Sequence, residues 1–445
     1  MGVLMQAFHW DCPRVDQKEF GWWKHVRAQL PALAKAGITS LWLPPAHKPG
    51  NIGGPSMGYD PYDYYDLGEF NQKGRVETWF GSKQELLDLI RDAHAQNLTV
   101  LADVVINHNS GADATEVNPI NNQARWTVFK AASGKFQRNW ECFHPSMYES
   151  WDEGVFGDMP DLSHRNPYVF AELLKLARWL IEEVGFDGFR FDFVRGYGAN
   201  TVTAIQEYRY MRDGRVFQPY GVAEFWDDAR AIARWVDTSN FSNSNPVDAF
   251  DFPLRETLKA LCDQQDFKLR DLTTADTLLQ REPQSTVTFV ENHDLRDEGR
   301  PIVSDKLLAY SFILAHEGYP CVFWKDYYNY GLGLEGTPNG ISALALAHER
   351  YAGGGTQVLW VDDGLYIMQR SGYGAQPGLI YVLNNRRDAW HGEWVTTQWR
   401  DKSFAPVAWW GTNDRGRPGD QHTGSDGRAQ FLAAPRGYTV YAPQA

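Results

Sequence analysis

Eight short runs of β-branched and aromatic residues, most of them separated by stretches with helical spacing, constrain the fold of this chain more than any other feature. The runs lie at residues 3–10, 38–45, 98–108, 186–193, 219–226, 247–254, 285–294 and 320–326. Between them, stretches such as 82–97 and 168–184 carry apolar residues at i, i+3, i+4 and i+7, which is the spacing of an amphipathic helix. Strands that alternate with helices in this way predict an α/β fold, a parallel (β/α)8 TIM barrel.

Two segments depart from this alternation. Residues 109–164, after the third strand, are polar and rich in Asn and Gly, and they lack a strong helical period. From residue 351 the pattern changes to short strands and turns, which is typical of an antiparallel β domain. We therefore expect a barrel built from residues 1–108 and 165–350, an inserted loop-rich domain at 109–164, and a C-terminal antiparallel β-sandwich at 351–445.

Charge and hydropathy argue against two classes of partner. The net charge is −13 and there is no basic run, so we expect no nucleic acid. No apolar run approaches the ~20 residues that span a bilayer, so we expect no membrane. The N-terminal MGVLMQAFHW lacks the charged and apolar regions of a signal peptide. Either such a peptide has been removed or the chain never had one.

The fourth strand places two opposite charges in an otherwise apolar segment. Arg190 and Asp192 stand among phenylalanines, and residues two apart in a strand point to the same side. A buried charge is costly, and pairing offsets only part of that cost. The pair therefore calls for a functional explanation.

Further polar residues stand at the carboxyl ends of the predicted strands, where barrels of this kind build their active sites. They are Asp103, Asn107, His108, Glu224, His293 and Asp294. We expect three carboxylates, those of Asp192, Glu224 and Asp294, to converge on one mouth of the barrel. Two carboxylates are what glycoside hydrolysis needs, one as nucleophile or base and the other as an acid with a raised pKa. A third anion can support the positive charge that develops on the sugar ring.

Five segments in this order carry a more specific signal: DVVINH (103–108), MPDLSH (159–164), GFRFDFVRG (188–196), AEFW (223–226) and FVENHD (289–294). They resemble the signature regions of the α-amylase family, glycoside hydrolase family 13. The stretch from Ser56 to Leu86 is most similar to the archaeal, plant and bacterial liquefying-type α-amylases. The resemblance runs through essentially the whole chain.

The resemblance implies a role for each acid. Asp192 would be the nucleophile that forms a covalent glycosyl intermediate. Glu224 would protonate the leaving oxygen and then activate water. Asp294 would bind ring hydroxyls and stabilise the transition state. Retention of configuration would follow, because two successive displacements need the first two carboxyl groups roughly 5–5.5 Å apart.

The same resemblance implies the sugar contacts. His108 and His293 would bind hydroxyls at the cleavage site, and Tyr59 would stack under that sugar. Arg190 would aim Asp192 and keep it ionised, since a neighbouring cation lowers the pKa of a carboxyl group. The leaving-group side would be lined by the remaining two predicted contacts, Arg195 and Trp226.

Oxygen ligands suited to calcium also follow from the resemblance. Ca²⁺ takes six to eight hard oxygen ligands, and the predicted set joins the insertion to the barrel. It consists of the side chains of Asn107, Asp152 and Asp161 and the carbonyl groups of Gly154 and Gly196. A zinc site, which some archaeal relatives hold nearby, is not expected. Of its ligands only His144 is retained here, and Glu149, Ser150, Trp151 and Ser163 occupy the other places.

These features predict an endo-acting α-amylase that hydrolyses internal α-1,4 bonds of starch or glycogen as a monomer. A maltooligosaccharide-forming or transglycosylating relative is the alternative, because water and a sugar hydroxyl compete for the same intermediate. A non-catalytic glucan-binding protein is a remote alternative, since such relatives lose one or more of the acids. The polymeric substrate favours an extracellular location, and a cytoplasmic enzyme acting on glycogen or maltodextrins is the other interpretation.

Overall fold

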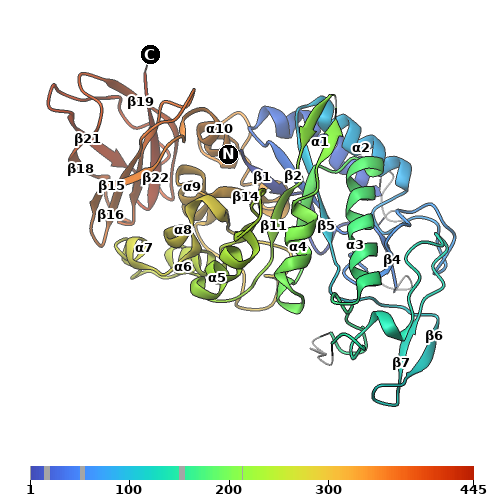
Figure 1. The fold of residues 1–445 in the computed structure, drawn as a ribbon. Coiled ribbons are helices and arrows are strands. Elements are labelled where there is room, and N and C mark those ends of the chain that lie inside the picture. The colour runs from blue at the N-terminus through green and yellow to red at the C-terminus, as the bar shows by residue number, and fades with distance from the viewer. Residues whose placement is uncertain (1, 15–20, 51–55, 150–155, 213, 445) are drawn as a thin grey trace.

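Eight parallel strands close into a barrel at the centre of the molecule (Figure 1). The computed structural model describes residues 2–14, 21–50, 56–149, 156–212 and 214–444. The barrel strands, in chain order, are β1 (Leu4–Gln6), β2 (Ser40–Leu43), β5 (Thr99–Val104), β8 (Gly188–Phe191), β11 (Tyr220–Ala223), β12 (Asp248–Phe250), β13 (Thr286–Phe289) and β14 (Tyr319–Phe323). Every neighbouring pair is parallel, from β1–β2 around to β14–β1. The predicted (β/α)8 barrel is confirmed.

Helices surround the barrel, and local sequence signals explain where some of them begin. The main helices are α1 (Gly21–Lys35), α2 (Lys83–Ala95), α3 (Pro167–Trp179), α4 (Ala199–Gln206), α5 (Ala229–Asn240), α6 (Phe252–Asp263), α9 (Lys306–Ala315) and α10 (Ile341–Tyr351). Ser82 and Glu85 form a capping box at the start of α2. The Asn166 side chain caps α3, and Pro167 supplies its first residue. The connections also contain short α7 (Asp271–Thr274), α8 (Leu278–Arg281) and the hairpin β9 (Tyr210–Arg212)–β10 (Arg215–Phe217).

The segment after β5 forms a projection at one end of the molecule (Figure 1). Its regular part is an antiparallel hairpin of β6 (Ala114–Asn118) and β7 (Gln123–Val128). A second small ladder joins β3 (Lys48–Pro49) to β4 (Pro61–Asp63). The chain returns beside the end of β5, where the Leu162 N–H donates to the Asn107 carbonyl at 2.7 Å and His108 pairs with Asp161. The base of the projection therefore lies at the mouth of the barrel.

The C-terminal part consists of antiparallel sheets at the opposite end (Figure 1). Its strands are β15 (Thr356–Val361), β16 (Leu365–Arg370), β17 (Leu379–Asn384), β18 (His391–Thr396), β19 (Ser403–Gly411), β20 (Gln421–His422), β21 (Arg428–Ala433) and β22 (Gly437–Pro443). The β18–β21 pair packs on the larger sheet around a shared apolar core that includes Ile367, Val382, Val395 and Phe431. Buried Arg436 ties this part to the barrel, donating to Asp305 Oδ2 and to carbonyls at the end of α6. The predicted antiparallel domain is confirmed, and the domain boundaries stay a prediction.

None of the helices in the described part of the chain is long and apolar enough to cross a membrane.

Candidate active site

Three neighbouring strands carry the charged residues at the heart of the site. In the register of the barrel, Asp103 on β5 lies beside Arg190 on β8. Asp192 and Glu224 follow directly after β8 and β11, respectively. The Glu224 N–H donates to the Phe191 carbonyl at 2.9 Å, which extends the ladder to the point where the acid leaves it. Parallel pairing thus delivers these side chains to the carboxyl-terminal mouth, as the sequence predicts.

Arg190 is the hub of this cluster. Its Nη1 lies 2.9 Å from Asp103 Oδ1 and 2.5 Å from Asp192 Oδ1, and its Nη2 lies 2.9 Å from Glu224 Oε2. The side chain is only 1% exposed. A planar guanidinium with donors at fixed angles can hold several carboxylates in one geometry, whereas an ammonium group cannot. Arg190 therefore fixes the relative positions of the two predicted catalytic carboxylates.

Asp103 completes the cluster; from the sequence we predicted its position at a strand end but no role. Its Oδ2 accepts hydrogen bonds from Trp42 Nε1 at 2.9 Å and from the Tyr59 hydroxyl at 2.7 Å. Oδ1 binds Arg190. The Asp103 side chain is fully buried, so it offers no open position to a substrate. Asp103 thus positions Arg190 and Tyr59. Its partner Trp42 could not be predicted from the sequence, because it lies on the neighbouring strand β2.

The pKa values of the two central acids are both raised. Burial is the main cause of the raised pKa of Asp192, and Arg190 opposes this effect without outweighing it. Burial likewise raises the pKa of Glu224, with Arg190 opposing and the charges of Asp192 and Asp294 adding to the rise. Arg190 acts on the pKa of Asp192 in the predicted direction, lowering it, but the opposing effect of desolvation is larger. A raised pKa suits Glu224 for proton donation.

The backbone next to Asp192 adds one more contact to Glu224. Phe193 has a φ of 42°, in the left-handed region that residues other than glycine seldom adopt. In this conformation its N–H donates to Glu224 Oε2 at 3.0 Å. Such strain costs about 1–3 kcal/mol and persists where the surroundings impose it. The turn after Asp192 thus helps to orient Glu224, and no sequence pattern predicts a left-handed phenylalanine.

Asp294 is the most open of the three predicted catalytic acids. Its side chain is 32% exposed, against 10% for Asp192 and 11% for Glu224. His293 Nε2 lies 3.2 Å from Asp294 Oδ2, while the Gln6 amide nitrogen contacts His293 Nδ1 at 2.9 Å. An amide nitrogen only donates, so Nδ1 accepts and the neutral ring carries its proton on Nε2, facing Asp294. Burial lowers the pKa of His293 to about 4 and keeps the ring neutral.

Parallel aromatic rings form one wall of the mouth. Tyr59 stacks on His293 with centroids 4.9 Å apart, and Trp10 lies parallel to both at 6.1 Å. The Arg296 guanidinium lies 3.8 Å above the Trp10 ring and 3.6 Å from Asp294 Oδ1. Trp10 and Arg296 were not predicted. The only signal for them was their nearness in sequence to strand ends.

The other predicted sugar contacts lie around this centre. His108 Nε2 bonds to the Tyr59 carbonyl at 2.9 Å, which fixes the tyrosine from behind. Arg195 donates to the Trp226 carbonyl at 3.0 Å and pairs with Asp227 at 3.3 Å. Trp226 stacks on Phe252 with centroids 4.6 Å apart. Arg195 and Trp226 are partly exposed, whereas His108 is only 1% exposed, and the contacts of all three with sugar stay a prediction.

Three of the five predicted calcium ligands can be placed. Asn107 and Asp161 are buried and adjacent, with Asn107 Nδ2 3.2 Å from Asp161 Oδ1. The side-chain oxygen of Asn107 has no hydrogen-bond partner within the described residues. A Cβ added to Gly196 would lie 1.9 Å from that oxygen, so the two residues touch. Asp152 and Gly154 lie outside the described residues. An unpartnered buried amide oxygen beside a buried carboxylate fits a hard cation.

The predicted absence of zinc rests on the sequence. His144 Nε2 lies 3.3 Å from Glu149 Oε2, and the Ser163 hydroxyl donates to the same oxygen at 3.0 Å. Over the ranges that the structure describes, no group of three or more His, Cys, Asp and Glu side chains could hold a metal ion.

A (β/α)8 barrel whose mouth gathers carboxylates around one guanidinium, with stacked aromatic rings beside them, is the architecture of a glycoside hydrolase. Comparison with known proteins makes this specific. Residues 11–323 match the family described as "Alpha amylase, catalytic domain", and the chain belongs to the alpha-amylase family. It is therefore a hydrolase of α-1,4-glucans.

Named relatives span much of the chain. The alpha-amylase of Bacillus licheniformis is 33% identical over 377 residues, which cover 74% of this chain and 71% of the relative. The glucan 1,4-alpha-maltohexaosidase of Bacillus sp. (strain 707) is 31% identical, covering 86% and 82%. The cytoplasmic alpha-amylase of Escherichia coli is 29% identical, covering 87% and 88%. The alpha-amylase of Geobacillus thermoleovorans, solved with acarbose, shares the fold with a TM-score of 0.70 at 18% identity, over 100% and 98% of the two chains.

Proposed function

We propose that this chain is an endo-acting α-amylase that cleaves internal α-1,4 bonds of starch, glycogen and maltooligosaccharides with retention of configuration. The observation that supports this most is that the carboxylates of Asp192 and Glu224 are bound by the two terminal nitrogens of Arg190. Both carboxylates therefore lie against the same guanidinium group. A single inverting displacement needs room for a water between the base carboxylate and the sugar, so two carboxylates held close together favour two displacements over one.

In the first displacement, Asp192 attacks the anomeric carbon and forms a C–O bond to it. The bond from that carbon to the glycosidic oxygen breaks, and Glu224 gives its proton to the departing oxygen. Burial keeps Glu224 protonated at a pH where an exposed glutamate would be ionised. Arg190 holds the attacking carboxylate in line, and the Phe193 N–H orients the acid.

In the second displacement, water enters where the leaving sugar was. Glu224, now ionised, takes a proton from the water. At the same time the water oxygen bonds to the anomeric carbon. The bond to Asp192 then breaks, and both carboxyl groups return to their starting state. Two inversions give a product with the configuration of the substrate.

Asp294 and the aromatic wall bind the sugar during both steps. Asp294 is open to the mouth, and His293 presents an N–H beside it, so the two can bind neighbouring ring hydroxyls. The Tyr59 ring offers a flat apolar face, and the bond from its hydroxyl to Asp103 sets the orientation of the ring. An anion near the ring also stabilises the positive charge of the oxocarbenium-like transition state.

Calcium is a further part of this proposal. Asn107 and Asp161 would supply side-chain oxygens and Gly196 its carbonyl, with Asp152 and Gly154 as predicted further ligands. The ion would supply a fixed charge that joins the insertion to the barrel. Because Gly196 lies four residues after Asp192, binding there would also hold the turn that carries Phe193.

The runner-up is a relative that forms defined maltooligosaccharides or transfers glycosyl groups. The 31% identity to a maltohexaosidase supports it. Both alternatives use the same acids and differ in the contacts beyond the cleavage site. An extracellular, monomeric enzyme remains our prediction, and the cytoplasmic relative from Escherichia coli supports the other location. Cell fractionation and light scattering test these two points.

The variant Glu224→Gln tests the assignment of the acid. It keeps the shape of the side chain and removes the transferable proton. We expect turnover of soluble starch to fall by at least about 10³-fold while maltoheptaose binding is retained. Hydrolysis at the wild-type rate would contradict the assignment.

A further inference from the structure

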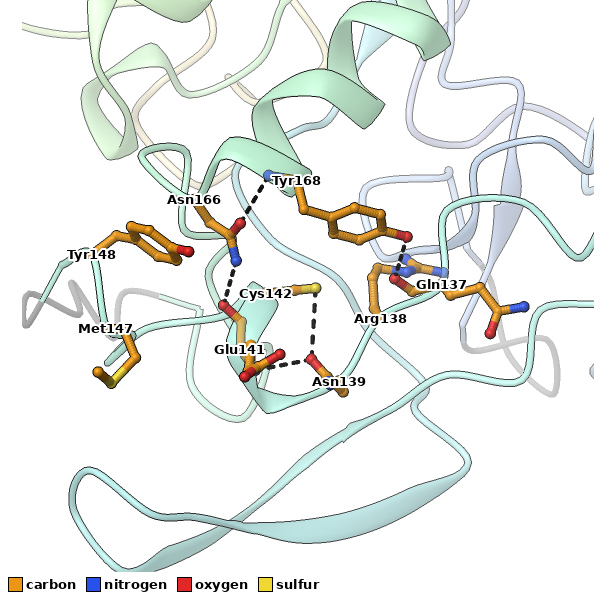
Figure 2. A pocket seen from close by; sticks show the side chains of 9 residues that line it. All are labelled: Gln137, Arg138, Asn139, Glu141, Cys142, Met147, Tyr148, Asn166 and Tyr168. Carbon is orange, nitrogen blue, oxygen red and sulfur yellow. Dashed lines mark hydrogen bonds between the residues drawn. The ribbon is translucent and has the colours of Figure 1, made fainter.

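A cavity of about 440 Å³ lies in the inserted segment, away from the residues of the mouth (Figure 2). Its volume is within the range of about 300–1,000 Å³ that small-molecule sites occupy. It is formed by the turn around Trp140–Cys142, the segment before residue 149 and the first turn of α3. The side chains that line it are Gln137, Arg138, Asn139, Glu141, Cys142, Met147, Tyr148, Asn166 and Tyr168.

Two tyrosines lie on either side of Asn166 and keep part of their surface open (Figure 2). Tyr148 is 50% exposed and Tyr168 is 42% exposed. The Tyr168 hydroxyl donates to the Gln137 carbonyl at 2.8 Å, and its ring packs edge-on against Phe136, so this ring is held in place. Tyrosine combines an apolar face with a polar edge, and a sugar ring presents the matching combination.

The wall behind the tyrosines is held rigid. Buried Arg138 donates through Nη2 to the Tyr62 carbonyl at 2.6 Å and through Nε to the Phe136 carbonyl at 3.2 Å. Its guanidinium lies 4.4 Å from the centroid of the Phe129 ring. Asn166 joins the two sides, accepting from the Tyr168 N–H and donating to the Glu141 carbonyl, both at 2.9 Å. A cavity preorganised in this way loses little entropy when a ligand binds.

Polar groups at the edge of the cavity are available to a ligand. Asn139 Oδ1 accepts from the Glu141 N–H at 3.1 Å, which leaves the Asn139 amide group as a donor. The Glu141 carboxylate is exposed and has no hydrogen-bond or ion-pair partner among the residues that the structure describes. An amide donor, a carboxylate acceptor and two open aromatic faces are the groups that bind sugar hydroxyls and sugar faces.

We propose that this cavity is a second α-glucan-binding site, separate from the catalytic mouth. It holds a short stretch of the same polymer, with Tyr148 and Tyr168 against the sugar faces and Asn139 and Glu141 on the hydroxyls. The inference rests on the proposed function, because an α-glucan hydrolase meets many chain segments besides the one it cleaves. Such a site raises the local concentration of polymer at the enzyme and has no effect on short substrates.

The test compares binding to polymer with turnover of a short substrate. In a Glu224→Gln background, we expect Tyr148→Ala to weaken adsorption to starch granules by roughly fivefold to tenfold, as the loss of a central aromatic contact does. Tyr148→Phe keeps the ring and is expected to stay within about twofold of the parent. With Glu224 restored, Tyr148→Ala should hydrolyse maltotetraose with unchanged kcat/KM.

Tyr373→Ala is the matched control, because it removes an exposed tyrosine in the C-terminal part, far along the chain from the cavity. If Tyr148→Ala and Tyr168→Ala adsorb as this control does, the second site is refuted. Equal losses of granule binding and of maltotetraose turnover would also refute it, because the cavity would then be part of the catalytic cleft. Failure of the wild type to cleave any α-glucan would overturn the proposed function instead, and granule adsorption of the Glu224→Gln variant would still report on the cavity.

Discussion

Asp192 and Glu224 share the guanidinium of Arg190, with Asp192 2.5 Å from one terminal nitrogen and Glu224 2.9 Å from the other. A third carboxylate, that of Asp103, lies 2.9 Å from the same nitrogen that contacts Asp192. Burying one cation among several anions is costly unless every partner stays in place. We therefore expect the buried contacts with Arg190 to hold the two predicted catalytic groups in place before substrate binds.

Replacing Arg190 with lysine keeps the charge but removes the two terminal guanidinium nitrogens that bind both acids. We expect kcat on soluble starch to fall by about 10²–10³-fold with a much smaller change in KM, because alignment in the transition state is lost. Breaking the buried pair should also destabilise the protein by about 3–5 kcal/mol. Steady-state kinetics and thermal unfolding measure the two effects.

Arg195→Lys is the matched control for that change. Arg195 is partly exposed and pairs with Asp227 at the rim, where ion pairs contribute about 0–1 kcal/mol. A loss of kcat as large as that of Arg190→Lys would show that the effect does not come from the shared guanidinium.

The pH profile should reflect the raised pKa of Glu224. Glu224 donates a proton only when protonated, so kcat/KM falls as pH rises through its pKa, and burial moves this limb to higher pH. The charge of Asp294 adds to the rise. Asp294→Asn should therefore lower the activity and also move the alkaline limb of the residual activity to lower pH. A limb that moved to higher pH would contradict this account.

Stability should depend on pH through the same group. The folded state holds the Glu224 proton at a pH where the unfolded chain has released it. The free energy of unfolding therefore falls as pH rises from the usual pKa of a glutamate to the raised one. Denaturant titrations at several pH values between these two pKa values measure how steeply the free energy of unfolding falls with pH. We expect this slope to become less negative in Glu224→Gln.

Tyr59 combines two functions that substitutions can separate. Tyr59→Phe removes the hydrogen bond to Asp103 and keeps the ring on His293. We expect it to reduce kcat/KM by about 10- to 150-fold, since one hydrogen bond to a charged group contributes about 1.5–3 kcal/mol. Tyr59→Ala also removes the stacking face and should raise KM further. Equal effects of the two variants would show that the ring does not contact sugar.

Removal of calcium should lower the Tm, because an ion bound only by the native state stabilises it by mass action. We expect excess chelator to lower the Tm of the wild type by several degrees, and Asn107→Ala or Gly196→Ala to reduce that shift. Asp158→Asn changes an exposed acid of the same segment and serves as the control. An unchanged Tm with chelator would contradict the proposed calcium site.

The eight strands could be predicted because each is a short run of apolar residues bounded by polar ones, and the barrel follows from their alternation with helices. Asp192, Glu224 and Asp294 could be found because strand ends of a parallel barrel meet at one mouth. The same reasoning reached Asp103 but gave it no role, since its partners Trp42 and Tyr59 come from distant parts of the chain.

Other features depend on tertiary structure alone. The stack of Trp10, Tyr59 and His293 joins segments almost 300 residues apart, and the left-handed turn at Phe193 is contrary to the preference of that residue. The sequence showed the cation that lowers the pKa of Asp192 but not the burial that raises it. The cavity between Tyr148 and Tyr168 had no sequence signal, because its walls come from three separate segments.

The most direct test of the central claim is the anomeric form of the first products from amylose, followed by NMR during the first minutes of reaction. A shared guanidinium that holds nucleophile and acid close together predicts that new reducing ends appear first as the α-anomer and reach the equilibrium mixture only by mutarotation. Initial release of the β-anomer would show a single inverting displacement and would contradict the roles assigned to Asp192 and Glu224.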